Sequence, residues 1–135
     1  MRRVVVPMLL LSLAGCASLQ QPSCAAGEEP MRTAQLFFGQ NIGDKPGVSD
    51  AEFRKFVDEV LTPRFPEGLT VLDGGGQWTG PENKLIREAA KVVVLVIPRK
   101  DLHTQHKLGE VRQAYVQRFH QDSVMMVSQR ACVSF

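Results

Sequence analysis

Polar and aromatic side chains that could build a binding or catalytic site gather in the middle of the chain. Residues 62–78 read T-P-R-F-P-E-G-L-T-V-L-D-G-G-G-Q-W, and a G-P-E-N turn follows. If that turn closes a β-hairpin, Trp78 lies near Leu85 and the three glycines lie opposite Arg87 and Glu88. The candidate ligand-binding residues are Arg64, Asp73, Gln77, Trp78, Arg87, Glu88 and, further along the chain, Tyr115.

Two interpretations of these residues are open. Three consecutive glycines at 74–76 remove side-chain bulk from a strand, which allows a bulge, a bend or the close approach of a ligand. Asp73 and Glu88, if they face each other across the hairpin, would form an acid–base pair in a polar pocket. The simpler interpretation is a twisted hairpin whose carboxylates form ion pairs with Arg64 and Arg87, because structural ion pairs also bring polar residues together.

The sequence carries no motif that assigns a reaction. It lacks a G-x-S-x-G nucleophile motif, a Cys–His signature and a dinucleotide fingerprint, and its glycines lack the spacing of a phosphate loop. The catalytic residues are therefore unknown, and we expect no cofactor. His103, His106 and Glu110 fall along one helix face, but no fourth ligand is indicated. We interpret them as a solvated polar face and expect no metal.

The first residues are typical of an export signal. Two arginines precede an apolar run that is too short to span a bilayer, and the run ends in L-A-G-C at Cys16. L-A-G-C at this place resembles the bacterial lipoprotein motif, which implies a signal peptide of residues 1–15, acylation of Cys16 and a membrane anchor. Ala17 is not acidic, so the resemblance implies outer-membrane sorting, facing the periplasm, in a host with two membranes. A plain secretory signal is the alternative.

The rest of the chain divides into a tether and one domain. Residues 16–33 are rich in small and polar residues and predict a lipidated, flexible tether. Residues 34–135 predict an α+β domain with the order β-α-β-β-α-β, in which a Ser49–Glu52 capping box opens a helix that ends before Pro63. This is the ferredoxin-like split βαβ order, a four-stranded antiparallel sheet with two helices on one face.

Two of the three cysteines fall where this order brings the chain ends together. The first and last strands of the fold are antiparallel neighbours, so the start of one lies beside the end of the other. After Cys16 takes the lipid, Cys24 and Cys132 remain at those two places in an exported chain. We therefore predict a Cys24–Cys132 disulfide. The alternative is two independent free thiols.

The balance of charged residues limits the kinds of partner that the protein could bind. Without Arg2 and Arg3, the 16 basic residues fall to 14 and match the 14 acidic residues, and no basic stripe with interleaved aromatics is present. This balance argues against nucleic-acid binding.

The strands of the expected sheet are apolar on both faces, as at Leu36, Phe37 and Phe38, although the helices cover only one face. Because so apolar a face is not normally left in water, we predict a homodimer packed sheet to sheet, or else an apolar ligand cavity.

Several motifs together resemble one protein family. F-F-G, V-S-D-A-E-F, T-P-R-F-P followed by G-Q-W, I-R-E-A-A-K-V-V-V and A-Y-V-Q-R-F-H-Q-D-S-V span residues 34–128. They resemble DUF3574, a family of small exported bacterial proteins of unknown function. The resemblance implies an envelope location and no particular activity, and Gly75 departs from the residue that the family commonly has there. The motif positions are Arg64, Asp73, Gln77, Trp78, Glu88, Tyr115, Phe119 and Gln121.

Two hypotheses of function follow. The first is a non-catalytic binding or interaction module of the cell envelope, anchored by its lipid, whose partner is a small molecule or another envelope protein. The alternative is a cofactor-free small-molecule enzyme that resembles the dimeric ferredoxin-like monooxygenases, with its site near Tyr115 and Trp78. This analogy rests on the fold alone. An enzyme of that kind needs a titratable group beside a cavity large enough for a substrate.

Overall fold

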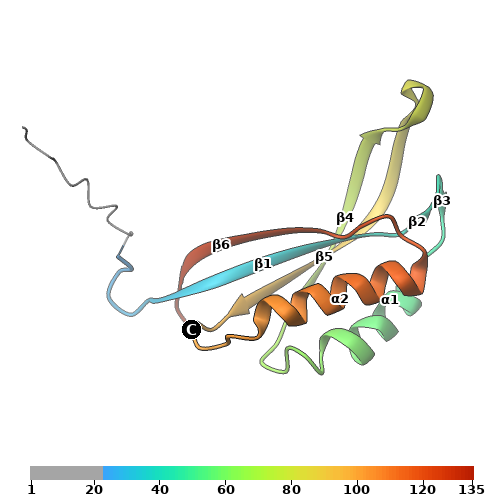
Figure 1. The fold of residues 1–135 in the computed structure, drawn as a ribbon. Helices are drawn as coiled ribbons and strands as arrows, with labels where there is room; N and C mark the ends of the chain where they lie inside the picture. Colours follow the sequence, from blue (N-terminus) through green and yellow to red (C-terminus); the bar gives the residue numbers. More distant parts are fainter. Residues whose placement is uncertain (1–22) are drawn as a thin grey trace, which may run out of the picture.

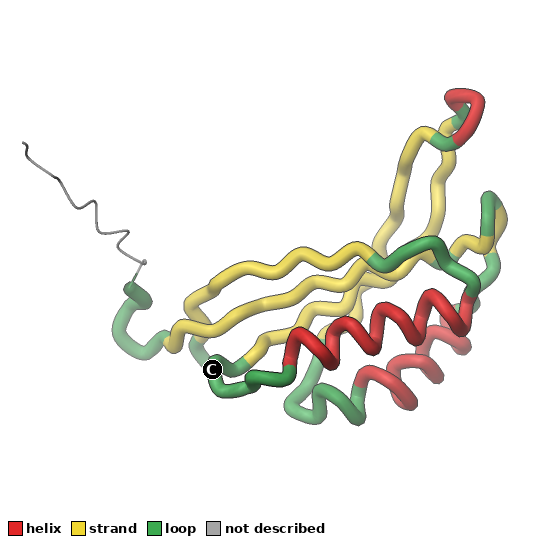
Figure 2. Tube along the Cα trace, in the orientation of Figure 1, coloured by secondary structure: helices red, strands yellow, loops and turns green. Residues whose placement is uncertain are grey.

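The computed structural model describes residues 23–135. Two helices cover one face of a four-stranded sheet, and the other face is open (Figures 1 and 2). The expected signal peptide, Cys16 and the start of the expected tether lie outside the described residues. Between Ser23 and Phe135 no helix is long and apolar enough to cross a membrane.

The described chain folds into four main strands, two helices and a small separate hairpin. The strands of the sheet are β1 (Glu29–Gly39), β4 (Thr70–Thr79), β5 (Leu85–Ile97) and β6 (Met125–Val133), and the helices are α1 (Asp50–Phe56) and α2 (Thr104–Phe119). The small hairpin pairs β2 (Asn41–Ile42) with β3 (Lys45–Pro46). The sheet order is β4-β5-β1-β6, and every pair of neighbours is antiparallel. The predicted ferredoxin-like α+β fold is confirmed.

The first helix begins at the predicted capping box. The Ser49 hydroxyl accepts a hydrogen bond from the Glu52 backbone N–H at 3.2 Å, and the Glu52 carboxylate accepts one from the Ser49 backbone N–H at 2.8 Å. These two bonds satisfy donors that a helix N-terminus otherwise leaves free. Beyond α1 the chain continues as a π-helical turn, Val57–Leu61, and the helical path ends ahead of Pro63.

The core lies between the helices and one face of the sheet. Leu36 and Phe38 of β1 and Val93 of β5 are completely buried there. The buried apolar residues of α2 are Leu108, Val111, Tyr115 and Phe119. An aromatic cluster fills the centre, with the Phe38 and Tyr115 rings edge to face at 4.7 Å between centroids. The cluster consists of Phe38, Phe53, Phe56, Tyr115 and Phe119.

The first strand is longer than expected. It begins at Glu29 and not at Ala34, so part of the expected tether belongs to the sheet. Residues 29–31 pair with β6 alone, and Glu29 lies opposite Val133. Their composition disfavours a strand, but the backbone of β6 supplies hydrogen-bond partners, and this pairing overrides the local propensity.

The structure brings Cys24 and Cys132 together at the end of the sheet where the described chain begins. Their sulfur atoms lie 2.06 Å apart and their Cα atoms 5.4 Å apart, which is disulfide geometry. Cys132 lies near the end of β6, opposite Pro30 of β1. The antiparallel pairing of the first and last strands thus places these residues side by side, 108 positions apart in the sequence.

Lys91 is the single charged residue among the described ones that is buried. Its side chain lies on the helix side of β5, where Nζ is 2.8 Å from Asp50 Oδ1 and also contacts Asp73. Hydrogen bonds to Asp50, and then to Asp73, raise the pKa of Lys91. The hydrogen bond from Lys91, and then the one from Gln40, lower the pKa of Asp50. Lys91 therefore ties the start of α1 to the edge strand β4.

We expect Lys91→Met to destabilise the protein near neutral pH and to matter less in acid. The folded-state pKa of Asp50 lies below its ordinary 3.8, so its contribution is complete above 3.8 and is lost as the pH falls through the folded-state value. The raised pKa of Lys91 acts in the other direction: its contribution is present below 10.5 and is lost as the pH rises through the folded-state value. Urea unfolding of both proteins from about pH 7 down to about pH 2 measures the difference.

The control for this experiment is Lys100→Met, which removes an exposed lysine that forms no ion pair within the part of the chain that the structure describes. It should change the free energy of unfolding little at any pH. A Lys91→Met defect that grew as the solution became more acidic would contradict the assigned role of the pair.

Candidate functional site

The β4–β5 hairpin extends past the other strands and turns up from the open face of the sheet (Figure 1). The pairing of β1 with β5 ends at Gly39 and Ala90, with one further backbone hydrogen bond from the Gln40 N–H to the Ala89 carbonyl at 3.0 Å. Residues 85–88 therefore pair with β4 alone. We call the two-stranded segment 75–89 the arm. A pocket of about 980 Å³ lies in the corner between the arm and the open face. Its size falls at the upper end of the range of about 300–1,000 Å³ that small-molecule sites occupy.

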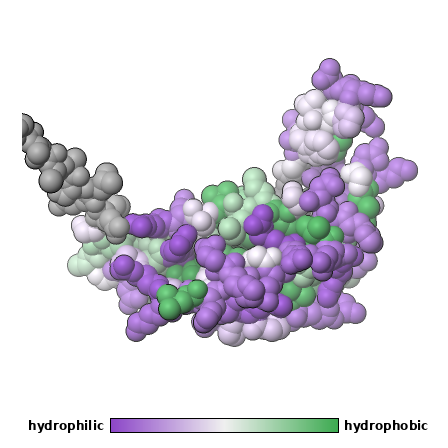
Figure 3. Space-filling model, in the orientation of Figure 1, coloured by the Kyte–Doolittle hydropathy of each residue, from purple (hydrophilic) through white to green (hydrophobic). Residues whose placement is uncertain are grey.

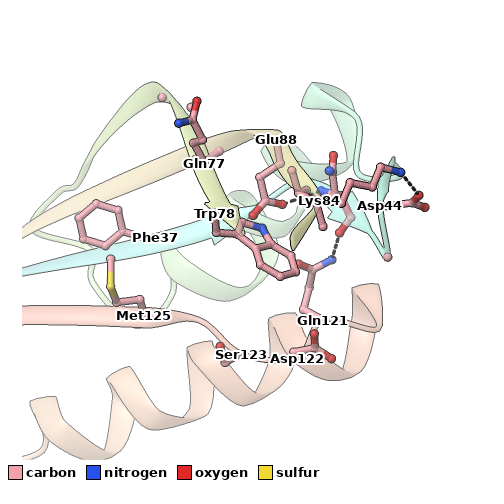
Figure 4. Close-up of a pocket in the computed structure, with 18 of the residues that line it drawn as sticks. Phe37, Asp44, Gln77, Trp78, Lys84, Glu88, Gln121, Asp122, Ser123 and Met125 are labelled. Carbon is pink, nitrogen blue, oxygen red and sulfur yellow. Dashed lines mark hydrogen bonds and ion pairs between the residues drawn. The ribbon is translucent and has the colours of Figure 1, made fainter. Parts of the chain in front are cut away.

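Apolar side chains from the sheet and the arm line this pocket (Figure 4). Phe37 of β1 lies opposite Met125 of β6, and Trp78 lies opposite Ile86 in the arm. The Trp78 ring points toward the loop that follows α2, where Gln121 lies. Trp78 is 47% exposed and Met125 is 57% exposed, and hydrophobic side chains show on the surface beside the base of the arm (Figure 3). The corner is therefore an apolar surface without a cover among the described residues.

Glycines leave room in this corner for one carboxylate, that of Glu88. A Cβ atom at Gly39 would lie 2.8 Å from Glu88 Oε2, closer than real contacts allow, and a Cβ atom at Gly76 would lie 3.4 Å from Glu88 Cγ. Gly76 is the direct cross-strand neighbour of Glu88, and Gly74 that of Ala90. Because these glycines have no side chains, the pocket is deeper here and the Glu88 side chain can extend across the sheet toward β1.

Glu88 brings a negative charge into a mostly apolar surface. Its Oε2 accepts a hydrogen bond from the Asn41 backbone N–H at 3.3 Å, and its carboxylate forms no ion pair within residues 23–135. The Asn41 carbonyl in turn accepts a hydrogen bond from Gln121 Nε2 at 2.6 Å, which ties the loop after α2 to the same corner. The carboxylate is half-buried and keeps acceptor capacity for a ligand.

The structure separates the other residues that the sequence grouped with Glu88. Arg64 lies between the helices, where its Nε donates to Glu110 at 3.0 Å. Gln77 accepts a hydrogen bond from Arg87 Nε at 3.0 Å. The ion pairs of Arg64 and Arg87 with hairpin carboxylates, one of the two interpretations, are therefore absent from the described residues. Of the hairpin candidates, Gln77, Trp78 and Glu88 line the pocket. The Trp78 and Glu88 side chains lie in the apolar corner, whereas the Gln77 side chain points away from it (Figure 4).

Asp73 and Glu88 do not form an acid–base pair. Asp73 lies opposite Lys91 and contacts it on the helix side of the sheet. Glu88 lies opposite Gly76 on the open side. Trp78 pairs with Ile86, next to Leu85. The glycines lie opposite residues 88–90, so Glu88 faces a glycine as expected, whereas Arg87 faces Gln77. Because successive side chains of a strand point to opposite faces, a shift of one residue exchanges the two sides.

Tyr115 lies in the core below the pocket and not in it. Its hydroxyl donates a hydrogen bond to the Gly39 carbonyl at 2.8 Å. Burial first, and then the negative charges of Glu88 and Glu52, raise the pKa of Tyr115, so the hydroxyl stays neutral. Its role is to hold the end of β1, and therefore Gly39, in place under Glu88.

Sequence reasoning missed several residues of the site. The sequence gives no signal for Gly39 and Asn41, because the role of both depends on the Glu88 side chain, which lies 47 positions from Asn41. Met125 belongs to the site because it lies opposite Phe37, and this placement follows only from the register of β6. Gln121 was noted through the family resemblance, and its contact with Asn41 supplies a physical reason for its presence at the corner.

The fold is similar to that of a phage SAM lyase. The solved structure of that lyase in complex with S-methyl-5'-thioadenosine is 15% identical in sequence and has a TM-score of 0.60, and the match covers 86% of this chain and 96% of that chain. The structure in the apo state is 18% identical with a TM-score of 0.58, and the match covers 86% and 97%. Identity this low shows a shared fold only. No curated protein matches the chain.

The family comparison covers most of the chain. The family model described as protein of unknown function (DUF3574) matches residues 33–135, which include the whole pocket and both helices. The chain therefore belongs to the DUF3574 family.

Proposed function

We propose that this protein is a non-catalytic binding module of the cell envelope whose pocket holds a small molecule with a flat apolar part and a cationic or hydrogen-bond-donating group. The observation that carries the proposal is the half-buried Glu88 carboxylate, without an ion pair in residues 23–135, beside the exposed ring of Trp78. An aromatic ring beside a carboxylate suits a ligand that stacks on the ring and donates a hydrogen bond to the carboxylate.

The negative charge of Glu88 favours a ligand that donates hydrogen bonds over a ligand that accepts them. A carboxylate accepts hydrogen bonds and repels anions, and bonds to charged groups contribute about 1.5–3 kcal/mol each. Phe37, Ile86 and Met125 in the lining favour a ligand with an apolar part. Envelope tethering through Cys16 completes the proposal and rests on the L-A-G-C motif.

Trp78 is the single tryptophan of the chain, so its fluorescence reports directly on the pocket. Benzylamine and benzyl alcohol are matched probes that differ mainly in charge. We expect benzylamine to bind more tightly, and Glu88→Gln to weaken its binding by about tenfold or more, because each factor of ten corresponds to about 1.4 kcal/mol. Benzyl alcohol should bind the variant as it binds the native protein.

Glu67→Gln is the matched control, since Glu67 is exposed and lies outside the pocket. It should leave both probes unaffected. Equal affinities for the cationic and neutral probes in the native protein would contradict the role of Glu88. Mass spectrometry of natively purified protein then identifies the molecule that co-purifies.

A second candidate function is catalytic and has one specific observation in its favour. The fold is shared with a SAM lyase whose structure holds S-methyl-5'-thioadenosine. S-adenosylmethionine combines an aromatic base with a sulfonium cation, which fits the pairing of Trp78 with Glu88. The test is incubation with S-adenosylmethionine and chromatography for S-methyl-5'-thioadenosine. Product formed by the native protein and not by Glu88→Gln would replace the binding proposal with an enzymatic one.

The predicted homodimer stays part of the proposal. Leu72, Val96 and Val127 are exposed on the open face next to the pocket, at 38–49% exposure, and a second copy packed sheet to sheet would cover them and close the open side of the pocket. Light scattering at about micromolar concentration measures the mass. A monomer without a bound ligand would contradict the dimer.

A further inference from the structure

Three arginines gather at the end of the sheet opposite the arm, where the described chain begins (Figure 1). Arg32 of β1 lies directly opposite Arg130 of β6, and Arg99 follows Ile97, the β5 partner of Arg32. Together they line a hollow of about 310 Å³ beside Cys24 and Cys132. Figure 1 shows that the C-terminus and the loop between β5 and α2 lie at this same end. We call this group of three arginines the basic cluster.

The three guanidinium groups of the basic cluster have no direct partner among residues 23–135. None of its three guanidinium groups forms an ion pair or a side-chain hydrogen bond with another residue of the described chain, whereas Arg64 and Arg118 pair with glutamates. The neighbouring Glu28 carboxylate bonds the Ala25 backbone N–H at 3.0 Å. Like charges directly opposite one another on a sheet are destabilising. An external anion would relieve that repulsion, and guanidinium groups suit phosphate because they donate in pairs.

Two hydrophobic side chains project at the same end. Leu102, in the loop after β5, is 88% exposed, and Phe135, two residues beyond β6, is fully exposed. They are the two most exposed large hydrophobic residues of the described chain. Lys100 is a neighbour of Leu102 in the same loop and adds a further positive charge. Basic groups beside projecting Leu and Phe side chains are the combination that binds a lipid–water interface.

We propose that the end of the domain formed by the basic cluster, Leu102 and Phe135 docks onto a phospholipid surface, with the guanidinium groups on lipid phosphates and the two hydrophobic side chains in the interface. The inference rests in one part on the proposed anchor at Cys16. Cys24 follows Cys16 by eight positions, so the anchor would hold this end within about 30 Å of the membrane at full extension. The arm and its pocket lie at the far end of the sheet and face away from the bilayer.

Vesicle sedimentation tests the docking with a polypeptide that starts at residue 17, because it carries no lipid and contains every described residue. We expect it to bind phosphatidylglycerol vesicles and to bind phosphatidylcholine vesicles far less, with the difference lost at high salt. Each basic side chain near an anionic surface contributes roughly fivefold in partitioning. The triple variant Arg32→Gln/Arg99→Gln/Arg130→Gln should therefore bind phosphatidylglycerol vesicles roughly a hundredfold less.

A charge-matched control separates a specific surface from net charge. Lys45→Gln/Arg54→Gln/Lys55→Gln removes the same charge from exposed places outside the hollow and should bind like the native chain. Leu102→Ser/Phe135→Ser should lower binding at high and low salt alike. Urea unfolding verifies that each variant is folded. Equal loss in the two triple variants, or no preference for the anionic vesicles, would overturn the proposal. Palmitate labelling of the full chain measures acylation of Cys16 separately, so failure of the anchor leaves the vesicle result interpretable.

Discussion

Replacing Cys24 and Cys132 with serine is expected to lower the free energy of unfolding by about 2–5 kcal/mol. The two residues are 108 positions apart, so the bond closes a loop that contains nearly the whole domain. Closing a long loop removes much of the conformational freedom of the unfolded chain, and the stabilisation grows slowly with loop length. A domain of this size has a total stability of about 5–15 kcal/mol, so the loss is a large part of it.

Urea unfolding of the double variant and of the native protein, each with and without reductant, measures this effect. Reductant should destabilise the native protein by a similar amount and leave the variant unchanged. The comparison also separates the bond from the packing of the two side chains, since reduction keeps both sulfur atoms. A native protein that unfolds at the same urea concentration with and without reductant would show that Cys24 and Cys132 are not bonded.

Phe38→Ala is expected to lower the free energy of unfolding by about 3–5 kcal/mol. Phe38 is completely buried, and its ring contacts Phe53, Phe56 and Tyr115, with centroid separations from 4.7 to 6.0 Å. Removing the ring leaves a cavity in a packed aromatic cluster and loses the edge-to-face contacts, which contribute about 0.5–1.5 kcal/mol each beyond their burial. The midpoint of urea unfolding should fall, with little change in the slope.

The neighbouring residue supplies a matched control. Phe37 carries the same side chain one position earlier in β1 but faces the pocket, where it is only half-buried. Phe37→Ala should cost less stability than Phe38→Ala and should weaken binding of both aromatic probes. The reverse order of stability would mean that the two faces of β1 are assigned the wrong way round.

Periodicity and capping predicted the fold because they act locally. The Ser49–Glu52 pair opens α1 as expected, and the spacing of Leu108, Val111, Tyr115 and Phe119 marks the buried face of α2. The proximity of the first and last strands also followed from the order of elements alone, and the structure brings Cys24 and Cys132 together there. Each of these inferences needed only a pattern within one element or a rule of topology.

The pocket could not be predicted in the same way because it depends on register. Glu88 shares the open side with its partner Gly76, and a shift of one residue in the pairing would exchange the two sides of the strand. Arg64 is close to this group in the sequence, but it lies just after the helical segment and forms an ion pair with Glu110 of α2. The bend of the arm away from the sheet has no signal in the sequence beyond the three glycines.

The position of the cysteines near the ends of the domain has a mechanical consequence. If the protein is anchored through Cys16 as proposed, a pull between its two chain ends would pass from Cys24 through the Cys24–Cys132 bond and on to Phe135. The strand pairs between these two cysteines would then carry little of the force. Nearly the whole domain lies within the covalent loop that the Cys24–Cys132 bond closes. A stretching force applied at the chain ends would therefore not separate the strands inside this loop.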